Sequence, residues 1–371
     1  MTDLFFELLQ VALGKGERLS HKPSADEWWL LYQESLKQSV GGFAFTALEL
    51  LSKSGQKPPT SLLYEWIGYS EQVKQQNVLI NNEAARLTKL FEQEGHNTAI
   101  LKGQANARLY KQPWCRQPGD IDIWVNGGKC KVEQTTRKLK LLEGNISNFA
   151  SEQDTNIAYH HFHLSKKENG IEVEVHFRPS SGNMNPFTNK RLQLFLEKEI
   201  KAGCSLVDEG FKVPCMRFAL VMQLAHIQRH LISEGVGMRQ VIDYFYLLRN
   251  DDENQRDNVS YQLRSFGLNH IAGALMWILH EKLGLEEKYL ISPLDEKRGR
   301  MMLRTIMEGG NFGHYKQKGD TLLGRTGAKH SRQLQMMKFD TVEALWTEID
   351  SIFFFFKTIP ERIRLRKWSL E

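Results

Sequence analysis

The chain has 371 residues, enough to bury more than one hydrophobic core and to form two or three subdomains. Hydrophobic residues make up 41% and charged residues 25%, which is ordinary for a soluble globular protein. The net charge of +5 is small for this length and gives no sign of a nucleic-acid-binding protein, and no stretch reaches the roughly 20 apolar residues that a membrane span needs.

The cysteines and the first residues predict a cytoplasmic protein. Cys115, Cys130, Cys204 and Cys215 show no C-x-x-C spacing, which argues against a zinc knuckle or a disulfide scaffold. Free thiols in a reducing compartment are the simpler interpretation. Residues 1–6 carry an early acid and lack a basic start followed by a long apolar run, so we expect no signal peptide.

The first part of the chain, residues 1–95, is predicted to be helical. Amphipathic runs occur at residues 27–32 and 43–51. The Lys-Pro-Pro sequence at residues 57–59 marks a break between helices, because proline cannot continue one. Residues 61–94 then predict one or two further helices.

A strand followed by a glycine turn opens the central region. Residues 97–101 are short, mostly apolar and compatible with a strand, and they run into Lys102, Gly103 and Gln104 before a helix-like stretch at residues 105–110. Such a turn leaves backbone N–H groups free to hold a phosphate, and glycine permits close approach. An ordinary strand-to-helix turn is the alternative.

Two aspartates, Asp120 and Asp122, are separated by one residue on a predicted strand. Side chains alternate along a strand, so the two carboxylates share one face, whereas Ile121, Ile123 and Val125 can pack into a core on the other. Neighbouring carboxylates repel each other unless positive charge lies between them. Mg²⁺ prefers carboxylate oxygens together with substrate phosphates, so the pair predicts a metal-nucleotide site.

A second acidic strand is predicted at residues 170–177, where polar and apolar residues alternate strictly. Glu172, Glu174 and His176 share one face, so this strand would supply a third carboxylate if it lies beside the first acidic strand. The preceding residues 162–170 predict the other strand and the turn of a β-hairpin. An amphipathic strand that faces water is the alternative.

Lys102 and Arg116 flank the first acidic strand in sequence and are candidate phosphate contacts. An arginine can bind a phosphate through two parallel hydrogen bonds. Either residue could instead be a solvated surface charge, which is the commoner fate of a single lysine or arginine. The choice between these two roles depends on where the folded chain places each side chain.

Two groups of histidines are interpreted as structural. His226 and His230 share a helix face, but an isoleucine stands where the metalloprotease pattern needs glutamate, so a polar network is favoured over zinc. They could also line a substrate cleft. On a strand, His161 and His163 would face one way and His160 the other, and the three are interpreted as neutral histidines without a special role.

The last part of the chain, residues 211–371, is predicted to return to helix, with a possible break at the glycines of residues 309–310. Arg239 and Asp243 are four residues apart and predict an ion pair that supports their own helix, with lining of a cleft as the alternative. The four phenylalanines at residues 353–356 are interpreted as part of a buried core helix rather than as a membrane or partner contact.

These motifs together resemble the uncharacterised nucleotidyltransferase-like family of the polymerase-beta nucleotidyltransferase superfamily. The resemblance rests on residues 101–103, 116–123 and 174–176, and it continues in residues 226–230 and 237–243. It implies an α+β fold with a small mixed β-sheet core and helical regions on both sides. The expected divisions are an N-terminal helical region (residues 1–95), a nucleotidyltransferase-like core (residues 96–210) and a C-terminal helical domain (residues 211–371).

The resemblance also implies a chemistry, the transfer of a nucleoside monophosphate from an NTP to an acceptor with Mg²⁺ or Mn²⁺ as cofactor. Asp120 and Asp122 would be metal ligands, and Glu174 would be the third ligand or the base, with Glu172 as its competitor. Lys102, Gly103, Gln104 and Arg116 would bind the phosphates. The acceptor is left open among protein, RNA and small molecules, and nucleic acid has no supporting basic or aromatic motif.

Two other hypotheses remain open. The superfamily carries a serine where this chain has Gln104, and the interval between Gly103 and Asp120 is longer than usual. These departures favour a catalytically inactive nucleotide-binding regulatory or interaction protein with the same fold. The other hypothesis is a helical interaction protein in which the acidic strand has no role.

Overall fold

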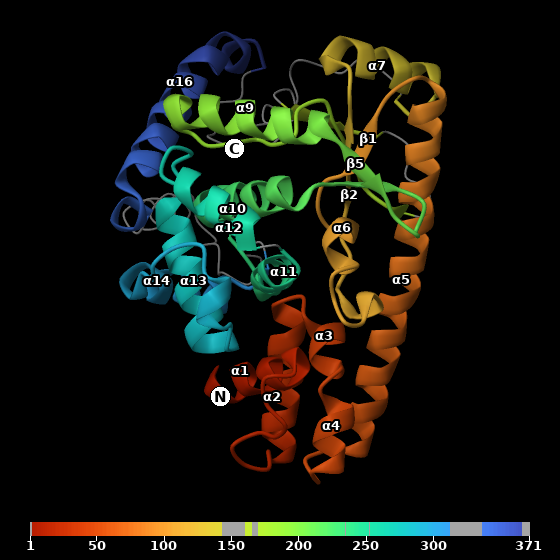
Figure 1. Cartoon of the computed structure of the whole chain (residues 1–371), viewed down its shortest axis with the longest axis vertical. Coiled ribbons are helices and arrows are strands. Elements are labelled where there is room, and N and C mark those ends of the chain that lie inside the picture. Colours follow the sequence, from red (N-terminus) through yellow and green to blue (C-terminus); the bar gives the residue numbers. More distant parts are fainter. Residues whose placement is uncertain are drawn as a thin grey trace.

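The computed structural model describes residues 2–142, 160–164, 170–233, 235–251, 253–311 and 336–365. Helices surround one small mixed sheet, so the predicted α+β class is confirmed. In Figure 1 the long helix α5 (Thr60–Gln93) runs along one side of the molecule, from the N-terminal helices at one end to the strands at the other. The C-terminal helices lie on the opposite side.

The N-terminal helices are α1 (Thr2–Leu13), α2 (Ala25–Lys37), α3 (Gly41–Phe45) and α4 (Leu48–Lys53). Helix α2 begins at a capping box, in which the Ser24 hydroxyl accepts the Glu27 N–H and the Glu27 carboxylate accepts the Ser24 N–H. The predicted break lies between α4 and α5, because Pro58 and Pro59 cannot lie inside a helix.

Helix α5 is a single helix of 34 residues, where the sequence allowed one or two. Leu62 and Trp66, in its first half, belong to a core shared with α1 to α4. Ala84, Leu87 and Phe91, in its second half, belong to a separate core beneath the sheet. One continuous helix therefore joins the N-terminal helices to the sheet.

The main sheet has the strand order β1-β2-β4-β3, with bounds β1 (Thr98–Ile100), β2 (Ile121–Val125), β3 (His161–His163) and β4 (Val173–His176). Strand β2 runs antiparallel to β1 and parallel to β4, and β3 runs antiparallel to β4. The predicted strands are confirmed as β1, β2 and β4, and the predicted hairpin is confirmed by the pairing of β3 with β4. Most of the predicted hairpin turn, residues 165–169, lies outside the described residues.

The two faces of β2 have different partners. Ile121, Ile123 and Val125 pack into the core formed with α5 and α7 (Gly128–Lys138), as the alternation predicted. Trp124 lies in the other core, which the N-terminal and C-terminal helices share. The acidic side of the sheet is thus covered by protein, and all five residues of β2 are buried. In β4 three of the four residues are buried and Glu174 is half-buried, so the alternative of a strand that faces water is wrong there.

Among the residues that the structure describes, the remaining elements are helices, two short 3-10 turns and a small hairpin. They are α6 (Gln104–Ala107), η1 (Pro113–Cys115), α9 (Pro186–Ala202), β5 (Cys204–Leu206), β6 (Lys212–Pro214), α10 (Met216–Ser233), α11 (Met238–Arg249), α12 (Glu253–Gln262), α13 (Asn269–Leu283), η3 (Glu287–Tyr289), α14 (Glu296–Gly309) and α16 (Thr341–Leu365). Helices α10, α11 and α13 contribute most of the buried residues of the C-terminal region. The predicted break at residues 309–310 is the end of α14.

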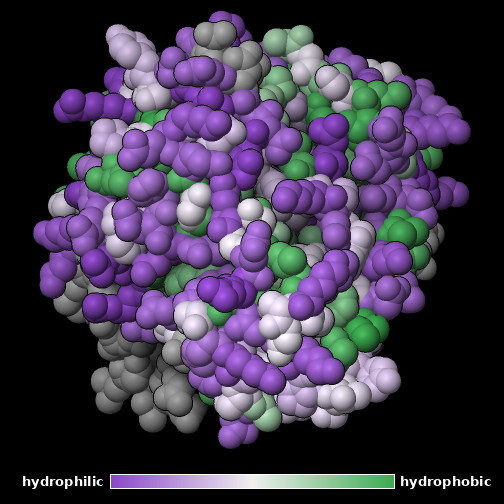
Figure 2. Space-filling view, turned by 60° about the horizontal axis from the view of Figure 1, so that its bottom comes forward, coloured by the Kyte–Doolittle hydropathy of each residue, from purple (hydrophilic) through white to green (hydrophobic). Residues whose placement is uncertain are grey.

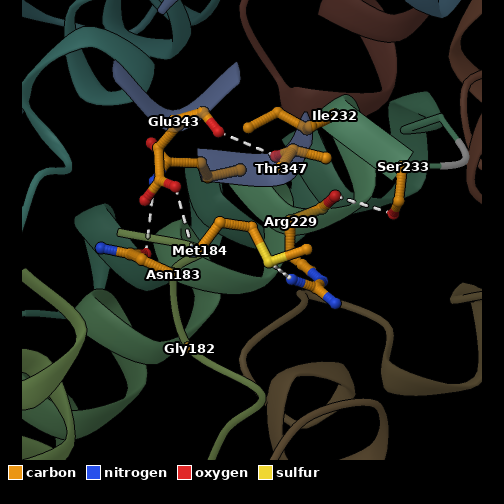
Figure 3. Close-up of a pocket in the computed structure, with 9 residues that line it drawn as sticks. Gly182, Asn183, Met184, Arg229, Ile232, Ser233, Glu343 and Thr347 are labelled. Atoms are coloured by element: carbon orange, nitrogen blue, oxygen red, sulfur yellow. Dashed lines mark hydrogen bonds between the residues drawn. The ribbon is translucent and has the colours of Figure 1, made fainter. Parts of the chain in front are cut away.

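Helix α16 is attached near its start by a buried carboxylate. Glu343 accepts the backbone N–H groups of Met184 and Asn185, both at 3.0 Å, and lines a small cavity with Arg229 and Ile232 of α10 (Figure 3). Burial raises the pKa of Glu343 to about 7, although the two N–H groups oppose this rise and the charge of Asp340 adds to it.

This carboxylate predicts a pH-dependent stability. Between pH 4.5 and about 7 the unfolded chain loses the Glu343 proton while the folded chain keeps it, so the free energy of unfolding falls as pH rises. We expect the free energy of unfolding of Glu343→Gln to depend less on pH in this range, since glutamine does not titrate. Urea unfolding at pH 5 and pH 7.5 measures it, with the exposed Asp350→Asn on the same helix as control. Equal pH slopes in Glu343→Gln and the wild type would contradict the assignment.

Helix α16 carries two exposed phenylalanines. Phe353 and Phe356 are 72% and 64% exposed, so the interpretation of this phenylalanine run as a buried core helix is wrong for these two positions. Figure 2, which turns the N-terminal end of the molecule forward, shows a mainly hydrophilic face with hydrophobic residues in small groups. In the part of the chain that the structure describes, no helix combines the length and the apolarity required to cross a bilayer.

Candidate functional site

The sheet brings two of the predicted acids side by side. Asp122 on β2 and Glu174 on β4 are register partners in a parallel pair, so their side chains leave the same face next to each other. Lys102 follows β1, the strand on the other side of β2. The order β1-β2-β4 therefore gathers residues that are 72 positions apart in the chain.

Asp122 is 1% exposed and lies between two positive groups. Lys102 Nζ is 3.1 Å from Asp122 Oδ2, and His176 Nε2 is 3.0 Å from Asp122 Oδ1. The sequence argument expected a cation to offset the repulsion between the acids. The structure places a lysine and a histidine of the chain itself in that role.

Glu174 has histidines on both sides. His176 Nε2 is 3.2 Å from Glu174 Oε2, His161 Nδ1 is 3.4 Å from the same oxygen, and His163 Nε2 is 3.8 Å from Glu174 Oε1. His161 and His163 share the face that the sequence predicted for them. Their interpretation as histidines without a special role missed this proximity, although the predicted hairpin contained the signal, because its pairing sets residues 161 and 163 opposite residues 176 and 174.

Burial and charge together set the protonation of the site. Burial opposes ionisation of Glu174, but the hydrogen bond from His176 and its charge, followed by the charge of Lys102, lower the pKa of Glu174 to about 2. Burial likewise opposes the charge of His176, whereas Asp122 and Glu174 raise its pKa to about 9. The carboxylates of Asp122, Asp120 and Glu174 raise the pKa of Lys102 against its burial. At neutral pH, Glu174 is ionised and both Lys102 and His176 are protonated.

Asp120 lies one residue before β2 and is half-buried. It lines a cavity together with Asp122, Lys102 and Gly103. Glu172, the competitor of Glu174, is exposed and lines a neighbouring cavity that also borders Asp120. Asp120, Asp122 and both candidates for the third acid thus lie in one part of the sheet. Glu174 is beside Asp122, and Glu172 borders the same cavity as Asp120.

Helices α10 and α11 form the opposite wall of the cavity that contains Asp120 and Asp122. The wall consists of Gln223, His226, Arg239, Gln240 and Asp243. His226 therefore lines the cleft, as the alternative interpretation from sequence suggested. Its burial, followed by the charge of Lys102, lowers the pKa of His226 well below the usual value, so the wall presents a neutral imidazole at neutral pH.

Arg116 is buried and forms a two-bond ion pair with Asp243. Its Nε and Nη2 atoms lie 2.7 and 2.8 Å from the two carboxylate oxygens, and the Tyr110 hydroxyl donates to the same carboxylate at 2.7 Å. Asp243, which helix spacing led us to expect beside Arg239, thus binds Arg116, which is 127 residues away in the chain. Arg239 donates to the carbonyl oxygens of Gln117 and Pro118, and so holds the loop that leads to Asp120.

The residues on either side of Gly103, in the turn after β1, point their side chains in different directions. Gly103 has a positive φ of +63°, which favours glycine, and it lines the cavity. The amide of Gln104 donates to Asn77 Oδ1 at 3.2 Å and to Asn81 Oδ1 at 2.6 Å, both on α5. The Gln104 side chain is therefore directed to α5, while Lys102 and Gly103 border the acids.

Comparison with protein families matches residues 24–284 to the family described as uncharacterised nucleotidyltransferase. The chain belongs to this nucleotidyltransferase family. The matched range runs from the N-cap of α2 to the end of α13 and contains both the main sheet and the cavity wall of α10 and α11. The comparisons with curated proteins and with solved structures give no match.

Membership of the nucleotidyltransferase family confirms the resemblance drawn from the motifs. It indicates nucleotidyl transfer as the general chemistry and an NTP as substrate. The carboxylates of Asp122 and Glu174 suit a divalent cation, because they offer oxygen ligand atoms that lie within 4.8 Å of each other.

Proposed function

We propose that the chain is a nucleotidyltransferase that uses Mg²⁺ or Mn²⁺ and an NTP to transfer a nucleoside monophosphate to a hydroxyl or phosphate group of an acceptor. The observation that carries the proposal is the register of Asp122 with Glu174 beside a cavity that also contains Asp120. Family membership supports the general chemistry.

Each acid has a proposed part. Asp120 and Asp122 hold the divalent ions, and Glu174 is the third ligand or the base. The bound ions would lower the pKa of an acceptor hydroxyl and stabilise the leaving pyrophosphate. The acceptor oxygen bonds to the α-phosphorus, the bond from that phosphorus to pyrophosphate breaks, and the hydroxyl proton passes to Glu174 or to water. The protein acts chiefly by position and charge.

Lys102 and Gly103 are proposed to contact the phosphates of the NTP. The Lys102 ammonium pairs with Asp122, and a lysine side chain is long enough to turn from one anion to another nearby. Arg116 was also assigned to phosphate from the sequence, but phosphate contact would require its buried pair with Asp243 to open. We therefore assign Arg116 to holding the cavity wall against the sheet.

The test is an NTP panel titrated into the full chain by calorimetry with and without Mg²⁺, followed by measurement of pyrophosphate release in the presence of candidate acceptors. Mg²⁺-dependent binding with release supports the enzyme. Binding without release supports the alternative, an inactive nucleotide-binding protein, which Gln104 in place of serine favours because its amide is engaged by α5. No binding of any NTP would reject both and leave the helical interaction protein.

The third acid can be identified by paired variants. We expect Glu174→Gln to lower turnover by about 100-fold or more, the usual effect of losing a metal ligand or a positioned base. Glu172→Gln should leave turnover nearly unchanged, since Glu172 is exposed and is not the register partner of Asp122. Steady-state pyrophosphate release measures both. The reverse order of effects would assign the role to Glu172.

A further inference from the structure

Strand β3 places two histidines on the side of Glu174 that is remote from Asp122. The strand order β2-β4-β3 sets Glu174 between its neighbours, with Asp122 on one side and His163 as its register partner on the other. His161 lies two residues earlier on the same face of β3. The group His161, His163 and Glu174 is therefore spatially distinct from the acidic pair of the proposed nucleotide site, although it shares one carboxylate with it.

The spacing of this group fits a single transition-metal ion. Its three ligand atoms lie within 4.8 Å of one another, with 3.4 Å between His161 Nδ1 and Glu174 Oε2 and 3.8 Å between His163 Nε2 and Glu174 Oε1. Zinc binds nitrogen and carboxylate oxygen at about 2.0–2.2 Å, so its tetrahedral ligands lie roughly 3.3–3.6 Å apart. The His161–Glu174 pair already has that separation, and a shift of about 0.2 Å would bring the His163–Glu174 pair to it.

The chemistry of the donors selects the class of metal. Two imidazoles with one carboxylate suit zinc and related first-row ions, whereas Mg²⁺ is bound through oxygen and seldom through histidine. Exposure differs across the group, because the side chain of His161 is 9% exposed and that of His163 is 45% exposed. Two ligands, His161 and Glu174, are thus largely buried, and the third, His163, lies at the surface, where an ion can enter and a water can complete the coordination.

We propose that His161, His163 and Glu174 form a second metal site, which binds a zinc-like divalent ion and shares only Glu174 with the proposed Mg²⁺ site. The assignment does not rest on nucleotide transfer, because it follows from β3 and its pairing with β4. The competing explanation is a purely structural chain of histidines, in which His160 Nε2 lies 2.8 Å from His161 Nδ1. That contact uses the same nitrogen of His161, so the ion and the His160 contact exclude each other.

The test is titration of the full chain with Co²⁺, read by its visible absorption, and with Zn²⁺ by calorimetry, in both cases without nucleotide. We expect one equivalent to bind and His163→Gln to weaken this binding by at least about 10- to 100-fold. His163 is exposed, so the variant should fold. The matched control is His21→Gln, also at an exposed histidine, which should bind as the wild type does.

The outcomes separate this site from the nucleotide site. No Co²⁺ or Zn²⁺ binding to the wild type, or equal binding in His163→Gln, would overturn the assignment and favour the structural chain of histidines. Asp120→Asn should keep Co²⁺ binding, because Asp120 is not in the group. Loss of Co²⁺ binding in Asp120→Asn would place the ion in the proposed nucleotide site and would also overturn the assignment.

Discussion

Replacement of Asp120 by asparagine is expected to lower metal-dependent NTP binding by about 100-fold or more while the fold stays intact. The proposed reason is the loss of one negative ligand from a site where oxygen donors hold a hard cation. The fold should tolerate the change because Asp120 is only half-buried and precedes β2 rather than lying within it. Calorimetric titration of the NTP with Mg²⁺ measures the loss, and circular dichroism checks the fold.

Asp208→Asn is the matched control, since Asp208 is an exposed aspartate in the β5–β6 hairpin and undergoes the same chemical change. It should bind the nucleotide as the wild type does.

Asp120 is also a better probe than Asp122, whose carboxylate is buried against Lys102 and His176. An Asp122 variant would leave the buried His176 and the partly buried Lys102 without their partner, and it would change stability as well as binding. Wild-type affinity in Asp120→Asn would remove Asp120 from the proposed site.

Removal of the Asp243 carboxylate is expected to have the largest effect on stability. Asp243→Ala should lower the free energy of unfolding by about 3–5 kcal/mol, because Arg116 would keep a buried charge without a counter-ion. The Tyr110 hydroxyl would lose its acceptor at the same time. An arginine side chain keeps its proton in proteins, so Arg116 cannot escape this cost by becoming neutral. Urea unfolding of the full chain measures the change.

Two variants test whether the effect comes from the pair. Glu49→Gln removes the carboxylate of the exposed Lys53–Glu49 pair and should change stability by only about 0.5 kcal/mol or less. The double replacement Arg116→Met with Asp243→Leu removes both buried charges and should recover much of the stability lost in either single variant. If the double variant lost as much free energy of unfolding as the two single variants together, the two residues would act independently.

Several elements were predictable from the sequence because their signals are local. Strict alternation in residues 121–125 and 173–176 fixes which side chains share a face, and both apolar faces pack as the pattern predicted. Pro58 and Pro59 mark the helix break for an equally local reason. The resemblance to the nucleotidyltransferase family rests on such short motifs, and the family comparison confirms it.

Which residues lie together in the site depends on contacts between distant parts of the chain, and the sequence does not show these contacts. The pairing of Arg116 with Asp243 joins the loop before β2 to helix α11, and the helix-spacing rule did not predict it. The exposed positions of Phe353 and Phe356 depend on which side of α16 the rest of the protein covers. Periodicity identifies an apolar face, but it does not say whether another element packs against it.

The sequence by itself determined the strands, the helical regions and the faces on which the acids lie, because a side chain's direction along a strand follows from its position alone. Only the tertiary structure decided that β4 lies between β2 and β3. That order sets Glu174 beside Asp122 on one side and beside His163 on the other. Strand order depends on the packing of residues far apart in the chain, and so no local pattern could supply it.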